Sequence, residues 1–341
     1  MKLRHILAAL ACTAATLAVV PAAQAAYKSE YKLSIVVGTT FPWGQGAVIW
    51  SDLVRERTDG RINIKLYPGT SLVQGDQTRE FTAIRQGMID MAVGSTINWS
   101  PQIKQLNLFS LPFLQPDAKA TDALINGEVG KDLFGYIEKA GVVPLAWGEN
   151  GFRQLSNSKH EVTKPEDMKG LKLRVVGSPL YMDTFSALGA NPTQMSWADA
   201  QPALANKAVD GQENPLSIYA GAKLYDVQQQ YLTLWNYVSD PLVFVVNRDV
   251  WKSWSEEDQK IVREAAIEAG KREIVIARTG ITAEDPALLK EIEGHGVKVT
   301  TLTPEQHAAF AKATEGVVEK WTKTIGEDLV KKARDAIAAS R

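Results

Sequence analysis

The chain has 341 residues, a formal net charge of −1 at pH 7 and a single cysteine. Its lysines and arginines are scattered along a near-neutral chain, which argues against a nucleic-acid-binding surface. No segment after the N-terminal stretch has the long uncharged run that a membrane span requires. The rest of the chain is about twice the length of a typical domain, which favours two domains over one.

Residues 1–25 have the pattern of a secretory signal peptide. Lys2 and Arg4 precede an apolar stretch, and an A-x-A cleavage site ends at Ala25. Cys12 lies inside the apolar stretch, which favours simple cleavage over lipidation. The mature chain then has no cysteine, and it is large enough to fold without disulfides in the periplasm, where we expect it.

The first half of the mature chain alternates between strand and helix patterns. The periodicity predicts a strand at 33–37, a helix that ends at Asp59-Gly60, a strand at 62–68, a short helix at 77–87 and a strand at 89–94. This order predicts a parallel sheet with crossover helices. Because ligands of such sheets bind beyond the C-terminal ends of the strands, residues 38–44 and 94–98 are expected at the rim of a cleft.

A second, unlike copy of this pattern follows. It predicts strands at 142–148, 171–177 and 241–247, a helix capped by Ser196, a long helix opened by Ser255 and a tail helix opened by Thr303. Two copies indicate two lobes, and the late helices are long enough to brace both. We assign residues 26–151 and 240–279 to lobe I, and residues 152–239 and 280–341 to lobe II.

The segment AVDGQENPLS, residues 208–217, has two interpretations. Asp210, Gly211 and Pro215 are typical of a turn, and the proline also forces Asn214 toward extended geometry. A simple connecting loop is usually flanked by solvated residues, whereas this one has apolar flanks. A set of polar groups held for a ligand therefore stays open beside the turn.

Motifs of known catalytic and metal sites are missing from the sequence. It contains no H-E-x-x-H, no G-x-S-x-G, no phosphate loop and no G-x-G-x-x-G after a strand. His160, His295 and His307 are far apart and lack ligand-like spacing, so we expect neither a metal nor a cofactor. Glu213 could serve as a general base, but no partner acid or nucleophile is in view.

Two arginines are ambiguous from periodicity alone. Arg174 shares the polar face of its predicted strand with Lys172, and most strand arginines are solvated. Arg153 is equally open to a solvated or a ligand-binding interpretation. Three tryptophans would ordinarily be packing residues, although each stands beside a predicted strand end or helix start: Trp43, Trp197 and Trp235.

Residues 148–216 resemble the signature region of the DctP family, the periplasmic solute-binding proteins of tripartite ATP-independent periplasmic (TRAP) transporters. The run contains KGLKLRV, GANPTQM and VDGQENP in this order. The first-lobe segments LYPGTSLVQGDQTREFTAIRQGMIDMAVGS and LPFL are also similar to the family. The resemblance thus covers essentially the whole mature chain.

The resemblance implies a two-lobed α/β periplasmic binding protein fold, with a ligand cleft between the lobes and a long helix spanning both. It also implies that Arg174 forms a bidentate pair with a ligand carboxylate, which a planar guanidinium matches better than lysine does. Arg153 would be a second basic contact, Asn214 would hydrogen-bond the carboxylate, and Trp197 would pack on the ligand.

Further site residues are less directly implied. By position, the lobe I candidates are Phe41, Trp43, Ser95 and Asn150. Many relatives carry a threonine and a histidine near the segment LTLWNYVSD, where this chain has Trp235 and Tyr237. We therefore expect Trp235 and Asn236 at the site and a bulkier pocket wall.

The function implied by the resemblance is that of a monomeric extracytoplasmic receptor. It would capture an organic acid anion and deliver it to the small and large TRAP membrane permease subunits, without breaking a bond. The alternatives are a periplasmic hydrolase or lyase, with Glu213 as base and Arg174 as anchor, and a sensor subunit that uses the same site. The acid could be a four-carbon dicarboxylate, a sugar acid or an aromatic acid.

Overall fold

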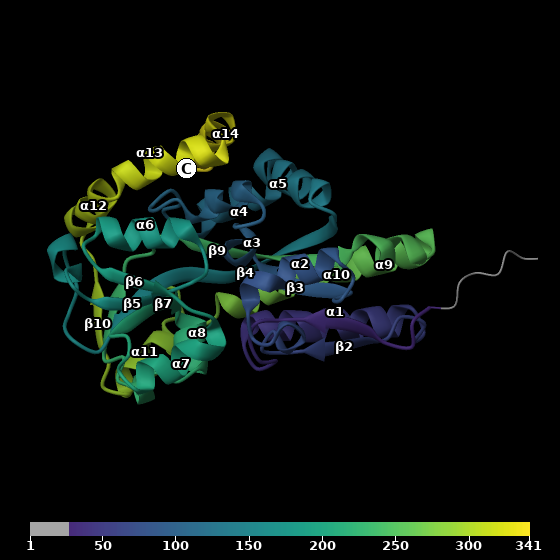
Figure 1. Cartoon of the computed structure of the whole chain (residues 1–341), viewed down its shortest axis with the longest axis horizontal. Helices are drawn as coiled ribbons and strands as arrows, with labels where there is room; N and C mark the ends of the chain where they lie inside the picture. Colours follow the sequence, from purple (N-terminus) through teal and green to yellow (C-terminus); the bar gives the residue numbers. More distant parts are fainter. Residues whose placement is uncertain (1–26) are drawn as a thin grey trace, which may run out of the picture.

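The computed structural model describes residues 27–341, so the predicted signal peptide lies outside the described residues. A mixed sheet of ten strands runs through this part of the chain (Figure 1). The strands are β1 (Tyr31–Ser34), β2 (Ile64–Tyr67), β3 (Met91–Ser95), β4 (Val142–Asn157), β5 (Lys172–Val175), β6 (Asn191–Gln194), β7 (Gly211–Pro215), β8 (Tyr231–Leu234), β9 (Ser239–Asn247) and β10 (Lys298–Thr301).

The order of the main sheet is β2-β1-β3-β9-β4-β7-β5-β6, while β8 pairs with β4 and with β10. β1 runs parallel to both β2 and β3, which confirms the predicted crossover pattern of the first half. β5 is parallel to β6 and β7, but β9 and β4 pair antiparallel with their neighbours. The two parallel ends are therefore joined by an antiparallel centre.

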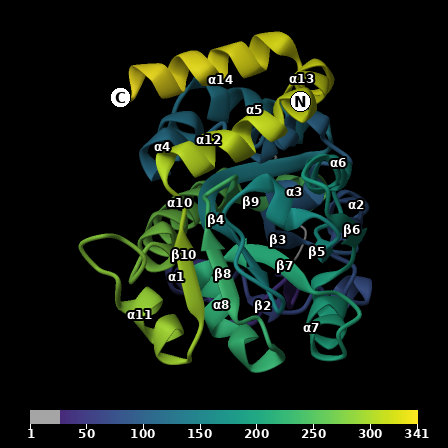
Figure 2. The ribbon, with the colours of Figure 1, turned by 90° about the vertical axis from the view of Figure 1, so that its left-hand side faces the viewer.

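Helices cover both faces of the sheet (Figures 1 and 2). One layer contains α4, α5, α6 and the C-terminal helices, and the other contains α1, α7, α8, α10 and α11. None of the helices in the described part of the chain is long and apolar enough to cross a membrane. The α-helices are α1 (Pro42–Arg57), α2 (Glu80–Arg85), α3 (Thr96–Trp99), α4 (Ala118–Asn126), α5 (Glu128–Lys139), α6 (Pro179–Ala187), α7 (Trp197–Ala205), α8 (Leu216–Gly221), α9 (Arg248–Ser253), α10 (Glu256–Ala277), α11 (Ala287–Gly294), α12 (Pro304–Ala313), α13 (Glu315–Ile325) and α14 (Glu327–Ala339).

β4 is much longer than the predicted strand at 142–148, and it passes through both halves of the molecule. The pairing register with β9 shifts between Glu149 and Gly151, and Gly151 has a φ of +115°. Glycine adopts this conformation without a steric penalty, so the strand continues past Gly151 with a local shift in its pairing instead of ending there. β4 pairs with β9 as far as Phe152 and with β7 from Arg153 onward.

The segment 208–217 is not the turn that its glycine and proline predict. Residues 211–215 form the buried strand β7, which lies between β4 and β5. Pro215 is tolerated because it is the last residue of the strand, where a missing N–H removes no ladder bond further along. The apolar flanks noted in the sequence lie just outside this strand, where Val209 and Leu216, the first residue of α8, are buried in an apolar cluster.

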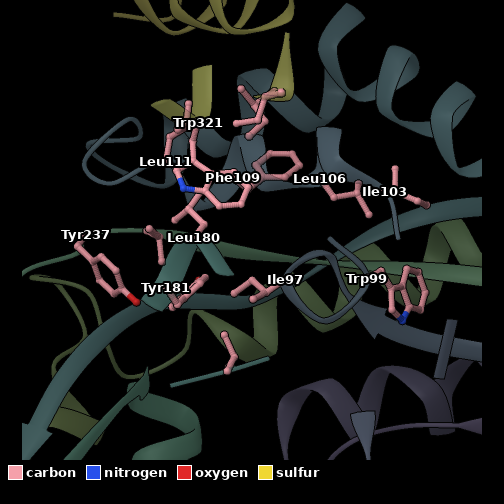
Figure 3. Packing of buried hydrophobic residues seen from close by; sticks show 14 of the residues in the cluster. Ile97, Trp99, Ile103, Leu106, Phe109, Leu111, Leu180, Tyr181, Tyr237 and Trp321 are labelled. Atoms are coloured by element: carbon pink, nitrogen blue, oxygen red, sulfur yellow. The ribbon is translucent and has the colours of Figure 1, made fainter. Parts of the chain in front are cut away.

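The C-terminal helices contact elements from distant parts of the chain. α12 begins at the predicted capping box of Thr303 and Gln306, but the tail is broken at Gly326, whose φ is +120°. α13 contacts α6 of lobe II and the 3₁₀ helix Lys104–Ser110 of lobe I, while α14 contacts α4 and α5 of lobe I. Figure 3 shows the shared core, with residues of both lobes in one apolar cluster.

A buried acid supports the turn that leads into α3. Glu80 is fully buried and accepts hydrogen bonds from Ser34 Oγ at 2.6 Å and from Trp99 Nε1 at 3.1 Å. The Trp99 ring lies against Gly94, where an added Cβ would sit 1.9 Å from it. Burial raises the pKa of Glu80 to about 7, although both hydrogen bonds oppose the increase. The side chain is therefore largely protonated below neutral pH.

Glu80→Gln is expected to remove a pH dependence of stability. Wild-type stability from this group is complete below the unfolded pKa of about 4.5 and is lost as the pH rises through about 7. The free energy of unfolding of the variant, relative to wild type, should therefore rise by about 3 kcal/mol between pH 4.5 and pH 8. Urea denaturation at both pH values measures this, and the exposed Glu56→Gln should show no comparable change.

Candidate functional site

A cavity is lined by residues from the segments assigned to both lobes. Its walls include residues just after β1 and β5 and at the end of β3, which agrees with the rule that ligands bind beyond the C-terminal ends of parallel strands. The lining residues from lobe I are Val36, Val37, Trp43, Gln77, Ser95, Asn98, Asn150 and Asp240, and those from lobe II are Arg153, Arg174, Val176, Trp197, Asn214 and Ile218.

Arg174 is buried without a carboxylate partner among the described residues. Its side chain is 1% exposed, its Nε donates to Met195 O at 3.1 Å, and its Nη2 has no hydrogen-bond acceptor. The guanidinium lies 5.7 Å from the centre of the Trp197 ring. Burial lowers the pKa of Arg174 to about 10, with Glu213 opposing the shift, so the group is still charged at neutral pH. Lys172, on the same strand face, is exposed.

Arg153 has the opposite environment. Its Nη1 donates to Asp240 Oδ2 at 2.9 Å, its Nη2 donates to Glu213 Oε1 at 2.9 Å, and its Nε is paired with Glu213 Oε2. Burial lowers its pKa, but the negative charges of Glu213 and Asp240 outweigh burial and raise it well above the usual value. The structure thus places Arg153 at the cavity with its charge already compensated by two carboxylates.

Asp240 is a cavity residue that sequence reasoning missed. Its Oδ2 accepts from Asn150 Nδ2 at 2.7 Å as well as from Arg153, and its Oδ1 accepts from Ser95 Oγ. Burial raises the pKa of Asp240, while the charge of Arg153 opposes the increase. One signal in the sequence could have indicated it: Asp240 is the only charged residue of β9 and stands directly before the apolar run of that strand.

The amides and tryptophans around the cavity are held by protein contacts. Asn214 donates to Gln212 Oε1 and accepts from Arg153 Nη2, so both ends of its amide are engaged. Trp43 Nε1 donates to Val93 O at 2.6 Å, which leaves the ring as an apolar wall. The Trp197 backbone N–H donates to Gln77 Oε1 at 2.8 Å, a bond that joins lobe II to lobe I.

Three predicted site residues do not line the cavity. Phe41 packs against Gly221, where an added Cβ would lie 2.7 Å from its ring. Trp235 is in the apolar core beside Phe310, and Asn236 is exposed and bonded to Gln154. Trp235 and Tyr237 belong to the shared apolar core, and the Tyr237 hydroxyl donates to Glu213 behind the cavity, so the bulkier pocket wall stays a prediction.

The groups expected for an enzyme or a metal site are otherwise occupied. Glu213 does not line the cavity, and its carboxylate is held by Arg153 and by the hydroxyl of Tyr237 at 2.7 Å. Within residues 27–341, no cluster of histidine, aspartate and glutamate has the arrangement of a metal site. The arrangement at the cavity is suited to holding one anion without transforming it.

Comparisons with known proteins agree with this geometry. Residues 33–324 match the family described as bacterial extracellular solute-binding protein, family 7. A TRAP periplasmic solute-binding protein from Ralstonia eutropha H16, solved with bound (S)-2-acetolactate, is 69% identical, with a TM-score of 0.91 over 92% of this chain and 100% of that one.

Other relatives bind different acids. The C4-dicarboxylate-binding periplasmic protein DctP of Shewanella loihica is 32% identical over 92% of this chain and 90% of its own. The 2,3-diketo-L-gulonate-binding periplasmic protein YiaO of Escherichia coli is 32% identical over 83% of this chain and 84% of its own. These proteins are transporter receptors, so the hydrolase or lyase alternative is not supported. The chain belongs to family 7 of the bacterial extracellular solute-binding proteins, the DctP family, and is a TRAP solute-binding protein with a two-lobed α/β fold that binds an organic acid.

Proposed function

We propose that this chain captures a small hydroxy or oxo acid of the size of 2-acetolactate in the cavity between the lobes. The single observation that carries the proposal is Arg174, a buried guanidinium whose Nη2 has no acceptor among the described residues. A buried cation of this kind is costly unless an anion pairs with it, and a carboxylate matches its planar fork. The ligand carboxylate would pair with Arg174 beside the Trp197 ring.

The size of the acid is supported by two observations. Trp43 and Trp197 form part of the cavity wall, and two bulky side chains leave room for a small ligand only. The relative from Ralstonia eutropha, at 69% identity, holds an acid of five carbons. Asn214 and Arg153 are proposed to act mainly by shaping the wall, because their polar atoms are engaged within the protein.

The place and the partners of the protein complete the proposal. The signal peptide would be cleaved after Ala25, and the mature monomer would work in the periplasm. There it would deliver its ligand to the small and large TRAP membrane subunits. The family's periplasmic location supports the compartment.

A thermal-shift screen over organic acids tests the proposed function. A ligand at about 100 times its dissociation constant should stabilise the folded protein by roughly 2.7 kcal/mol. We expect 2-acetolactate and related small hydroxy acids to raise the melting temperature. The matched neutral amides should not, because they leave Arg174 unpaired. A screen in which no small acid stabilises the protein, or in which amides match their acids, would overturn the proposal.

A further inference from the structure

The charged groups around the cavity are shared unequally between two arginines. Two arginines, Arg153 and Arg174, and one carboxylate, Asp240, line the cavity, while Glu213 lies behind Arg153. All four side chains are at least 98% buried. Arg153 is bound by both carboxylates, so Arg174 alone presents uncompensated positive charge. One ligand carboxylate can pair with Arg174, and the lining residues offer no second uncompensated cation.

Asp240 retains capacity for one more hydrogen bond. An ionised carboxylate accepts about four hydrogen bonds, two on each oxygen. Among the described residues, Oδ2 accepts from Asn150 and Arg153, whereas Oδ1 accepts from Ser95 alone. Because Asp240 lines the cavity, a donor on the ligand can use the remaining position. A hydroxyl group has such a donor and a second carboxylate does not.

We propose that Asp240 determines the specificity of the site: it accepts a hydrogen bond from a ligand hydroxyl and excludes a second ligand carboxylate. This inference rests on the proposed function, since it concerns the acid held by Arg174. The selected class is small hydroxy monocarboxylates, and the excluded class is dicarboxylates of the same size.

A purely structural role for Asp240 is the competing explanation. In that case it would only hold Arg153, as Glu213 does, and ligand selection would depend on shape. The two carboxylates differ in one respect that matters here: Asp240 lines the cavity and Glu213 does not. Glu213→Gln is therefore a matched control, because it also removes a buried carboxylate bound to Arg153 but leaves the cavity wall unchanged.

The charge is tested with two acids of the same shape. In 2-hydroxy-2-methylpropanedioate, a carboxylate replaces the acetyl group of 2-hydroxy-2-methyl-3-oxobutanoate, so the two differ mainly in charge. By isothermal titration, wild type should bind the dicarboxylate at least about 100-fold more weakly, given the repulsion of like charges about 4 Å apart near a protein surface. In Asp240→Asn, the difference in affinity between the two acids should fall below about 10-fold. In Glu213→Gln, the difference should stay closer to that of wild type.

The hydroxyl is tested with a second pair. Wild type should bind 2-hydroxy-2-methylpropanoate about 10-fold or more tightly than 2-methylpropanoate, as expected for a hydrogen bond to a charged acceptor. Asp240→Ala should abolish most of this preference.

The outcomes separate the two proposals. If no small monocarboxylate binds, the proposed function fails. If monocarboxylates bind and the dicarboxylate binds wild type equally well, only the role of Asp240 fails, and this comparison needs no variant to fold. Equal effects of Asp240→Asn and Glu213→Gln on the ratio, in variants with wild-type circular dichroism, would also overturn it.

Discussion

Arg174→Lys is expected to weaken ligand binding by roughly thirty-fold to several-thousand-fold, although it keeps the positive charge. Lysine cannot reproduce the planar two-bond contact with a carboxylate. Removing one partner from a buried charge pair typically costs about 2 to 5 kcal/mol, at about 1.4 kcal/mol per tenfold change in affinity. Arg174→Met should be at least as damaging. Isothermal titration with 2-acetolactate measures both variants.

Two controls accompany this prediction. Lys172→Ala, on the same face of β5 but exposed, should change the affinity little. Without ligand, Arg174→Met should be no less stable than wild type in urea, because it removes a buried cation that has no carboxylate partner among residues 27–341. Near-wild-type affinity in Arg174→Lys would remove Arg174 from the site.

Arg153→Met is expected to affect stability first. It leaves the carboxylates of Glu213 and Asp240 buried without the cation that both contact. Loss of one partner from a buried ion pair typically costs about 3 to 5 kcal/mol. We therefore expect a decrease of that size in the free energy of unfolding without ligand, measured by urea denaturation at pH 7.

The cause can be checked with a second substitution. Adding Glu213→Gln to Arg153→Met removes one of the two orphaned charges, so it should restore part of the lost stability. If the single variant were as stable as wild type but bound ligand poorly, Arg153 would be a ligand contact rather than the internal counter-ion seen in the structure.

Periodicity predicted the elements that repeat regularly. The parallel arrangement of β1, β2 and β3 and the caps of α7, α10 and α12 were predicted from alternation and capping residues. The centre of the sheet was not. Gly151 is a turn signal locally, but β4 continues through it because β4 has strand partners on both sides of this position. The turn residues of 208–217 likewise enclose a strand, β7, which is held between β4 and β5 and ends at Pro215.

The site was predictable only in part, for a similar reason. The family motifs indicated Arg174 and Arg153, but they did not distinguish the uncompensated guanidinium from the paired one. That distinction depends on Asp240, which is 87 residues from Arg153 in the sequence. Pairing of Gly151 with Asp240 across β4 and β9 brings them together, and no local pattern reports this pairing.

The cavity walls come from both lobes, and this has a consequence for the rate at which ligand is released. The bond between the Trp197 N–H and Gln77 joins residues on opposite walls of the cavity. We expect a bound acid to be released when contacts of this kind break, so its residence time should depend on how often they open. A membrane partner that prefers the separated lobes must weaken acid binding by the same factor by which the acid weakens binding of that partner. Binding of the acid and binding of such a partner would then be linked through one conformational equilibrium.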